Sequence, residues 1–362
     1  MHMRRKVGSL ILALALAASS VTGALAAASP AQGAYDRAAA FVTRAVPAPE
    51  VSSIGGEWAV IGLTRGGATR PQGYDGGYLS RVEQTVTEKA GVLHSRKYTE
   101  YSRVILALSA LNQDARDVGG YDLTLPRGDF DKTVWQGING PIWALIALDS
   151  RNYPMPQNPQ AKTQATRQMY VDRILSRQLS DGSWSLSGEG SGDVDVTAMA
   201  LQALSRYTDQ AAVQTAVDRA LSWLSVQQQA DGGFATGGAA NAESCAQVVV
   251  ALESLGLPLT DSRFVKNGAT ALDALLSYQL SDGSFCHVKD GGSNLMATEQ
   301  GLYALAAVKR AEQGESWLYV MEGLDAADGQ SDLSTIAFAP GLVALLTVIG
   351  SSSHGVLLLP RG

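Results

Sequence analysis

Hydrophobic side chains recur along much of this chain with the period of an α-helix. Two segments place apolar residues three or four positions apart, so that they fall on one face of a helix. These positions are Val213, Val217, Leu221 and Leu224, and then Val265, Ala269, Leu272 and Leu276. We therefore expect an amphipathic helix over each of these two segments.

A short motif follows each amphipathic stretch and occurs three times between residues 165 and 310. Each copy has a Gln, an Asp-Gly pair at its fourth and fifth places and an aromatic residue at its seventh, and the copies begin at Gln178, Gln228 and Gln279. Glycine suits such a turn because it adopts positive φ without a steric penalty. A strongly apolar stretch begins 17 to 19 residues after each Gln. The repeating unit is thus an amphipathic helix, a turn and a more apolar helix.

Weaker copies of the apolar second helix extend the pattern in both directions. They occur at 58–63, 101–111 and 138–148, and a further copy is expected at 334–346. Sustained alternation of apolar and polar residues, the sign of β-strands, does not accompany them. The sequence therefore predicts an all-α fold of six to seven helical hairpins.

The first 26 residues have the order of a secretory signal peptide. A basic start, Met1–Lys6, precedes a long apolar run that ends in the small residues Ala24-Leu25-Ala26, the pattern that signal peptidase cleaves. An uncleaved membrane anchor is the alternative. We expect export with cleavage after Ala26, a single domain over 27–362 and no stable membrane span in the mature chain, because the apolar run 334–350 is short and interrupted by Pro340.

Composition removes several classes of function. The formal net charge is −6 and no block of five basic residues occurs, which disfavours nucleic acid and anionic lipid as partners. Two Cys are too few for a disulfide-dense or multi-Cys zinc module, and four His disfavour a His-rich metal site. We expect no metal and no cofactor.

The three units resemble the QW-type motifs of the prenyltransferase and squalene-oxidase repeat. That repeat occurs in terpenoid cyclases, protein prenyltransferases, thioester domains and cobalamin carriers. The resemblance covers roughly residues 34–350 and is strongest over 165–310. It implies an α/α toroid, in which inner and outer rings of helices enclose a central cavity. Because this family hosts unrelated activities, the resemblance does not decide the function.

In such a toroid the inner helices are parallel, so that their N-termini share one rim. Unsatisfied N–H groups and helix dipoles make this rim favourable for anions. The polar and aromatic residues near the expected helix starts are candidate ligand-binding residues, namely Trp58, Tyr101, Asn139, Trp143, Glu243, Glu299 and Tyr303. For the polar residues the alternative role is N-capping.

The segment Asp193-Val-Asp195-Val-Thr197-Ala is similar to the acid motif of squalene and oxidosqualene cyclases. The resemblance implies Asp195 as general acid and Asp193 as its partner. Two features depart from it: Val196 replaces the second member of the usual Asp pair, and helix dipoles at the rim favour the ionised form of a carboxyl group.

Two further resemblances are incomplete. Glu243-Ser-Cys245 is similar to two zinc ligands of protein prenyltransferases, but Ala297 stands where the histidine ligand is expected. The stretch Ala297-Thr-Glu299-Gln300 looks like a thioester motif whose essential Cys is replaced by Ala297. For Cys245 and Cys286 a disulfide, two free thiols and metal binding all stay open.

Two functions follow as hypotheses. The first is an exported toroid that binds an apolar or corrinoid-like small molecule, or a partner protein, at the mouth of its central cavity. The alternative is a terpenoid (squalene-type) cyclase-like enzyme that uses Asp195 as general acid.

Overall fold

The computed structural model describes residues 29–51 and 54–321. These residues belong to one compact unit. The expected signal peptide and the helix expected over 334–346 therefore fall outside the described residues. Within the described part, none of the helices is both long and apolar enough to cross a bilayer.

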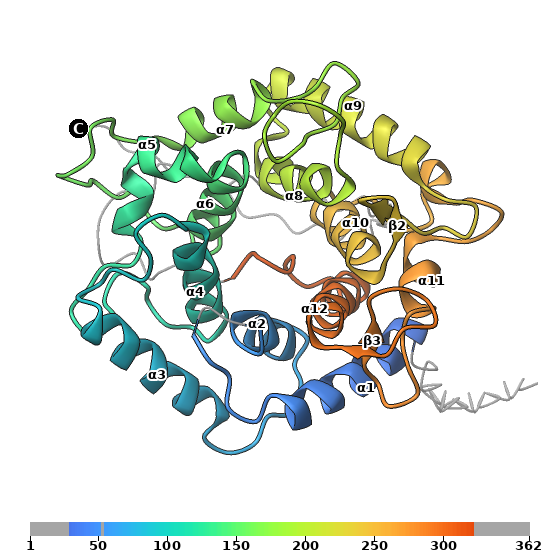
Figure 1. Cartoon of the computed structure of the whole chain (residues 1–362), viewed down its shortest axis with the longest axis horizontal. Helices are drawn as coiled ribbons and strands as arrows, with labels where there is room; N and C mark the ends of the chain where they lie inside the picture. The colour runs from blue at the N-terminus through green and yellow to red at the C-terminus, as the bar shows by residue number, and fades with distance from the viewer. Residues whose placement is uncertain (1–28, 52–53, 322–362) are drawn as a thin grey trace, which may run out of the picture. The chain divides into compact units, whose positions relative to one another are not determined.

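Twelve α-helices of the described part alternate between an outer and an inner ring (Figure 1). The outer ring contains α1 (Pro30–Ala45), α3 (Tyr74–Glu88), α5 (Phe130–Thr133), α7 (Arg167–Leu175), α9 (Ala211–Gln227) and α11 (Ala271–Leu276). The inner ring contains α2 (Glu57–Arg65), α4 (Thr99–Ala110), α6 (Asn139–Asp149), α8 (Val194–Leu204), α10 (Ala242–Ser254) and α12 (Leu295–Glu312).

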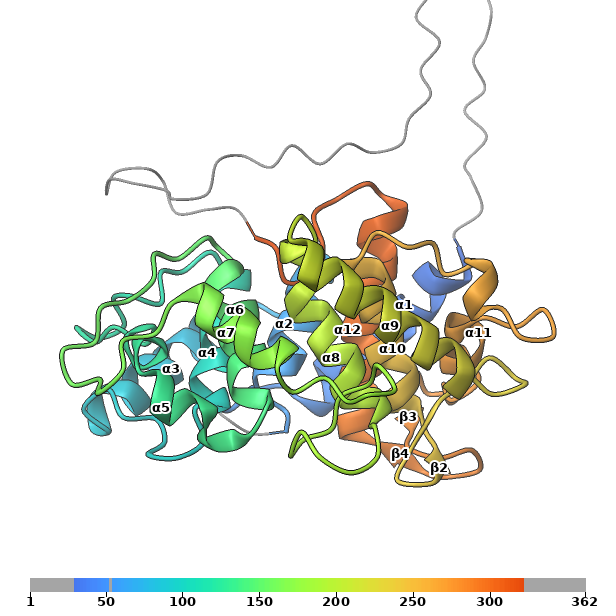
Figure 2. The same cartoon turned by 90° about the horizontal axis from the view of Figure 1, so that it is seen from above.

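Short elements connect these helices. The 3-10 helices are η1 (Leu125–Gly128), η2 (Val134–Gln136), η3 (Ser205–Tyr207) and η4 (Ser262–Phe264). Two antiparallel hairpins precede α10 and α12: β1 (Ala235–Thr236) pairs with β2 (Ala239–Ala240), and β3 (Phe285–Cys286) pairs with β4 (Ser293–Asn294). Both hairpins lie at the rim where the inner helices begin (Figure 2).

The inner helices close into a ring. Each packs against the next along the chain, and α12 packs against both α2 and α1. This arrangement confirms the predicted all-α toroid, with six hairpins in the described residues. Outer and inner helices differ in how much of their surface is buried. The outer helix α9 buries one face, whereas the inner helix α6 is buried on all sides from Gly140 to Asp149. Complete burial suits α6 because this helix is apolar all round.

The repeated Gln residues join neighbouring hairpins. The side-chain amide of Gln178 donates to the carbonyls of Gly182, in its own turn, and Ala216, on the next outer helix. Gln228 does the same with Gly232 and Phe264. Gln279 donates to the carbonyls of Gly283 (3.3 Å) and Ala34 (2.8 Å). Because Ala34 belongs to α1, the third copy connects the last hairpin to the first.

Glycine in these turns is required by both conformation and contact. Gly232 has φ +84°, and a Cβ there would lie 2.4 Å from the carbonyl oxygen of Thr270 on the next hairpin. Gly182 and Gly283 face the carbonyls of Arg219 and Arg37 in the same way. Their turns therefore press directly against the backbone of the following outer segment.

The helix expected over 265–276 is shorter than predicted. Asn267 and Gly268 have positive φ and form a tight turn, in which Lys266 and Ala269 exchange backbone hydrogen bonds. Helix α11 then starts behind Thr270, which forms a capping box with Asp273. An Asn-Gly pair favours a two-residue turn, and this local preference overrides the helical spacing of Val265 and Ala269.

The chain after α12 runs across the rim at which the inner helices end (Figure 1). The Arg65 guanidinium donates to the carbonyls of Trp317, Leu318 and Val320, and the amide of Met321 donates to the carbonyl of Ser150. This segment therefore covers one end of the ring.

Candidate functional site

Asn and Asp side chains cap three of the six inner helices, α8, α10 and α12, at the opposite rim. Asp193 Oδ1 accepts from the amide of Val196 (2.9 Å), Asn241 Oδ1 from that of Ser244 (2.8 Å), and Asn294 Oδ1 from that of Ala297 (2.9 Å). Asp193 therefore serves as the N-cap of α8, a role that sequence reasoning did not assign to it.

Asp195 lies in the first turn of α8, close to the β1–β2 hairpin. Its Oδ1 accepts a hydrogen bond from the hydroxyl of Thr236 (3.1 Å), which in turn accepts from Ser244. Burial raises the pKa of Asp195, and its hydroxyl partners reduce the shift only in part. Desolvation thus raises this pKa, whereas the sequence led us to expect that the rim would lower it.

Glu243 and the two cysteines lie on the neighbouring elements. Glu243 Oε2 is 2.8 Å from His287 Nδ1, and the His287 side chain is half exposed. Cys245 and Cys286 are buried free thiols, so the disulfide left open by the sequence is not formed. Burial raises the pKa of the Cys245 thiol to about 12, which disfavours the thiolate that a metal site needs. The described residues contain no group of three or more possible metal ligands.

Glu299 and Glu57 are buried carboxyl groups on adjacent inner helices. Glu299 Oε1 accepts from the amide of Gly55 (2.9 Å), and burial raises its pKa to about 7. Glu57 accepts from the hydroxyl of Tyr78 (3.2 Å) and lies 3.9 Å from Arg103. Sequence reasoning missed Glu57, although it directly precedes Trp58 at an expected helix start.

Three of the four predicted aromatic residues meet inside the ring. The Trp58 ring centroid lies 5.3 Å from that of Trp143 and 5.5 Å from that of Tyr303. Tyr319, which the sequence did not indicate, contacts Trp143 at 6.0 Å. These rings pack against one another. Tyr101 is not among them, because it packs against Tyr98 between α4 and the η1 segment.

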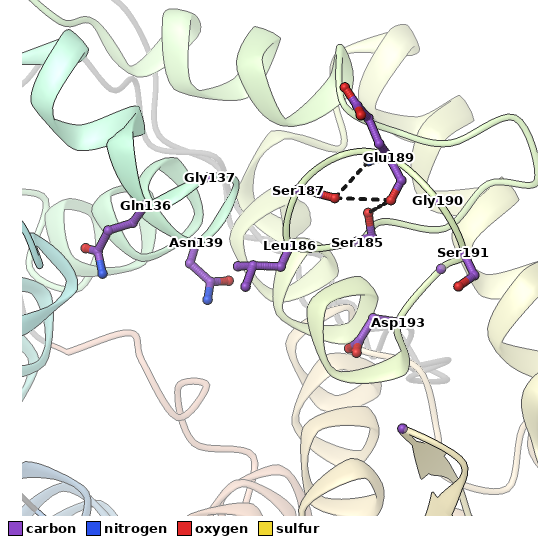
Figure 3. Close-up of a pocket in the computed structure, with 12 residues that line it drawn as sticks. Gln136, Gly137, Asn139, Ser185, Leu186, Ser187, Glu189, Gly190, Ser191 and Asp193 are labelled. Atoms are coloured by element: carbon purple, nitrogen blue, oxygen red, sulfur yellow. Dashed lines mark hydrogen bonds between the residues drawn. The ribbon is translucent and has the colours of Figure 1, made fainter.

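An open depression of about 910 Å³, which we call the rim basin, lies at the starts of α6 and α8 (Figure 3). Its lining includes Gln136, Asn139, Leu186, Ser187, Glu189, Ser191 and Asp193. Asn139 and Asp193 are thus predicted residues that line it, whereas Glu243 and Glu299 do not. The rest of the lining was missed; its only sequence signal is the Gly- and Ser-rich stretch between the first turn and α8.

The loop 185–193 organises its backbone with its own serines. The hydroxyls of Ser185 and Ser187 both donate to the carbonyl of Glu189, as Figure 3 shows. In the described part of the chain, neither the carboxylate of Glu189 nor the hydroxyl of Ser191 takes part in a hydrogen bond or ion pair, and Asp193 uses only Oδ1. The rim basin therefore offers acceptors that the fold does not use.

Comparisons with known proteins agree with this fold. The model of the A-macroglobulin TED domain family matches residues 142–252. No curated protein matches the sequence. Protein geranylgeranyltransferase-I of Candida albicans aligns with a TM-score of 0.55 and 12% identity over 80% of this chain and 95% of its own. Unsaturated glucuronyl hydrolase from Bacillus sp. GL1 aligns with a TM-score of 0.54 and 14% identity over 81% of this chain and 100% of its own.

A type II terpene cyclase, MstE from Scytonema, aligns with a TM-score of 0.48 and 14% identity over 78% of this chain and 99% of its own. The alignments with TM-scores of 0.55 and 0.54 confirm the resemblance to the prenyltransferase and squalene-oxidase repeat as a shared α/α-toroid fold. At these identities the likeness concerns the fold alone and leaves the activity open.

Proposed function

We propose that this chain is an exported binding protein that takes a ligand or a partner protein at the rim where its inner helices begin. The observation that carries the proposal is the rim basin, whose open volume of about 910 Å³ is lined by amides, hydroxyls and carboxylates. Export is supported by the order of the first 26 residues, which is that of a signal peptide.

The lining favours a ligand with many hydrogen-bonding groups. Leu186 is a large apolar side chain of the basin and is 52% exposed. Asn139 Oδ1 has no hydrogen-bond partner in the described residues, whereas the amide of Gln136 is bonded to Thr99. An amide-rich corrinoid-like molecule or a polar loop of a partner protein meets these groups better than a wholly apolar molecule does. The aromatic residues that could line an apolar pocket, Trp58, Trp143 and Tyr303, contact one another instead.

A cyclase-like activity is the second candidate, because one observation favours it. Burial raises the pKa of Asp195, as a general acid requires. The same carboxyl group is engaged with Thr236, and the rim basin is lined by Asp193 rather than by Asp195.

The binding proposal is tested by native mass spectrometry of protein secreted by its own source. We expect a molecule or partner chain that stays with the wild type and is lost from Ser191→Trp, which places a large ring in the rim basin. The matched control is Ser222→Trp on the exposed face of α9, which should retain it. Equal retention by both variants would contradict binding at this basin, and sequencing the N-terminus of the secreted protein tests cleavage after Ala26.

The cyclase alternative requires a separate assay. Purified protein is incubated with squalene and with shorter isoprenoids, and products are analysed by gas chromatography. The binding proposal expects no product from either wild type or Asp195→Asn. A cyclic product that disappears in Asp195→Asn would replace the binding proposal by the enzymatic one.

A further inference from the structure

The segment before α5 holds an arginine whose burial is not matched by a carboxylate. Arg127, in η1, is 0% exposed. Its guanidinium lies over the rings of Tyr98 (4.9 Å) and Tyr101 (5.4 Å), both at the start of α4. Cation–π contacts of this kind stabilise a desolvated cation only in part.

Only one of the three guanidinium nitrogens has a hydrogen-bond partner in the described part of the chain. Nη1 donates to the carbonyl of Tyr98 (2.6 Å) and to the hydroxyl of Ser102 (3.1 Å). Nε and Nη2 are buried and have none. These two nitrogens share one edge of the planar group, the edge that makes two parallel N–H···O bonds to a carboxylate or phosphate.

Other arginines of the ring show how this chain satisfies such a group elsewhere. Arg167 is paired with Asp149 at 2.7 Å, and Arg310 is paired with Glu315 at 2.7 Å. Arg65 lacks a carboxylate but donates from Nε and Nη2 to a row of backbone carbonyls. Arg127 has neither arrangement.

The carboxylate nearest to Arg127 in sequence is already used. Asp129 caps α5 through the amide of Lys132 (3.1 Å) and lies 3.2 Å from the ammonium group of the same lysine. The N-terminus of α4 adds a partial positive charge beside Arg127. Burial lowers the pKa of Arg127 only to about 10, so the guanidinium is charged at neutral pH. Among the described residues, this charged guanidinium has no ion-pair partner.

We propose that the Nε–Nη2 edge of Arg127 is an internal oxyanion site, which a small carboxylate or phosphate anion fills in the folded protein. The anion would accept two parallel hydrogen bonds from the guanidinium and offset its charge next to the α4 N-terminus. This site is separate from the rim basin and does not rest on the proposed function. Exposed residues 95–97 directly precede Tyr98, which places the site close in sequence to the rim surface.

The first test measures the unfolding temperature against acetate, phosphate and chloride, with ionic strength kept constant by a bulky organic sulfonate. For the wild type we expect a saturable rise with the two oxyanions, of roughly 5 °C once the anion is a hundredfold above its dissociation constant. Arg127→Met should lose the rise, and Arg127→Lys should lose most of it, because it keeps the charge without the bidentate edge.

The matched control is Arg96→Met, which removes a positive charge from an exposed neighbouring position and should respond like the wild type. A wild type without a saturable response, or an Arg127→Met variant with an unchanged one, would overturn the proposal. A response to chloride as large as that to both oxyanions would overturn the bidentate assignment. Retention of only the acetate or only the phosphate effect would support the site and name its anion.

A second measurement needs no variant. In protein with ¹⁵N-labelled arginine, the Nε–H resonance assigned to Arg127 should shift with the oxyanion and saturate at the concentration that saturates the unfolding temperature. A resonance that stays unchanged throughout the titration would contradict the site even if Arg127→Met does not fold.

Discussion

The turn that contains Gln178 and the loop that follows it differ sharply in what their polar groups do. In the turn, the side chains of Gln178 and Asp181 form hydrogen bonds with backbone and hydroxyl groups of the turn itself and of the next outer helix. In the loop 185–193, the carboxylate of Glu189 and the hydroxyl of Ser191 are left to the rim basin within the described structure. The two hydrogen bonds of the Gln side chain recur in all three copies, whereas the loops after the turns differ in sequence.

This difference indicates that the turns determine the fold and the loops determine binding. The hydrogen bonds of each turn reach the next outer segment, so a change there alters how hairpins join. The loops contact the frame less and line the open volume, so they can vary without disturbing the ring. We expect stability to depend mainly on the turns and binding mainly on the loops.

The largest effect is expected from Gly232→Ala. The new Cβ would lie 2.4 Å from the Thr270 carbonyl at a φ of +84°, and we expect a loss of about 3–4 kcal/mol in the free energy of unfolding. The matched control is Gly190→Ala in the loop, where φ is +80° but no atom lies within 4 Å, and about 1 kcal/mol is expected. Urea unfolding measures both, and equal losses would show that the contact with Thr270 does not matter.

The next effect concerns Glu299, a buried carboxyl group at the rim. Its pKa is about 7 in the folded protein against an ordinary value of 4.5. Between these values the unfolded chain is ionised while the folded protein keeps its proton, so stability falls as pH rises and levels off above about pH 7. Glu299→Gln should remove up to about 3 kcal/mol of this dependence, measured by urea unfolding from pH 4.5 to 8.

The control for Glu299→Gln is Glu83→Gln, an exposed carboxyl group on α3. It should leave the pH dependence of the wild type unchanged. A Glu299→Gln variant whose stability falls with pH as steeply as the wild type would contradict the raised pKa.

A smaller effect is expected from Gln228→Ala. Its buried amide donates to the carbonyls of Gly232 and Phe264, which would lose their partner, at a cost of about 2 kcal/mol. The neighbouring exposed residue supplies the control, and Gln229→Ala should change stability by less than about 0.5 kcal/mol. If Gln228→Ala and Gln229→Ala unfold at the same temperature, the side chain of Gln228 does not stabilise the junction between hairpins.

The smallest effect on stability is expected from Ser191→Trp in the loop. The residue is exposed and makes no hydrogen bond in the described structure, so we expect a change within about 0.5 kcal/mol together with the loss of the bound molecule. Unfolding and native mass spectrometry on the same sample measure both. A large loss of stability would mean that the loop supports the frame after all.

Much of the frame could be predicted from the sequence because its signals are local. The spacing of Val213 to Leu224 and the Asp-Gly turns identify the hairpins without knowledge of the partners. The Asn267-Gly268 pair is also a local signal for a turn, but the helical spacing of the apolar residues around it led to the prediction of a longer helix. Asn139 and Asp193 could be placed at the rim because helix starts are recognisable.

The rest of the site depends on long-range packing. Tyr101 was expected with the other aromatics, but the buried Arg127 holds it elsewhere. Tyr319 reaches Trp143 from the end of the described chain, and no periodicity points to it. The loop 185–193 carries Gly and Ser, which indicate irregular structure but not the volume that it borders.

The hydrogen bond from Gln279 to Ala34 spans 245 residues and makes this protein unlike an open array of repeats. An open array that loses one unit is merely shorter, because each unit contacts only its neighbours. Here the deletion of one hairpin would leave α12 and α2 unable to meet, and the apolar sides of both would be uncovered. Closure therefore makes every hairpin of this ring a condition for the burial of the others.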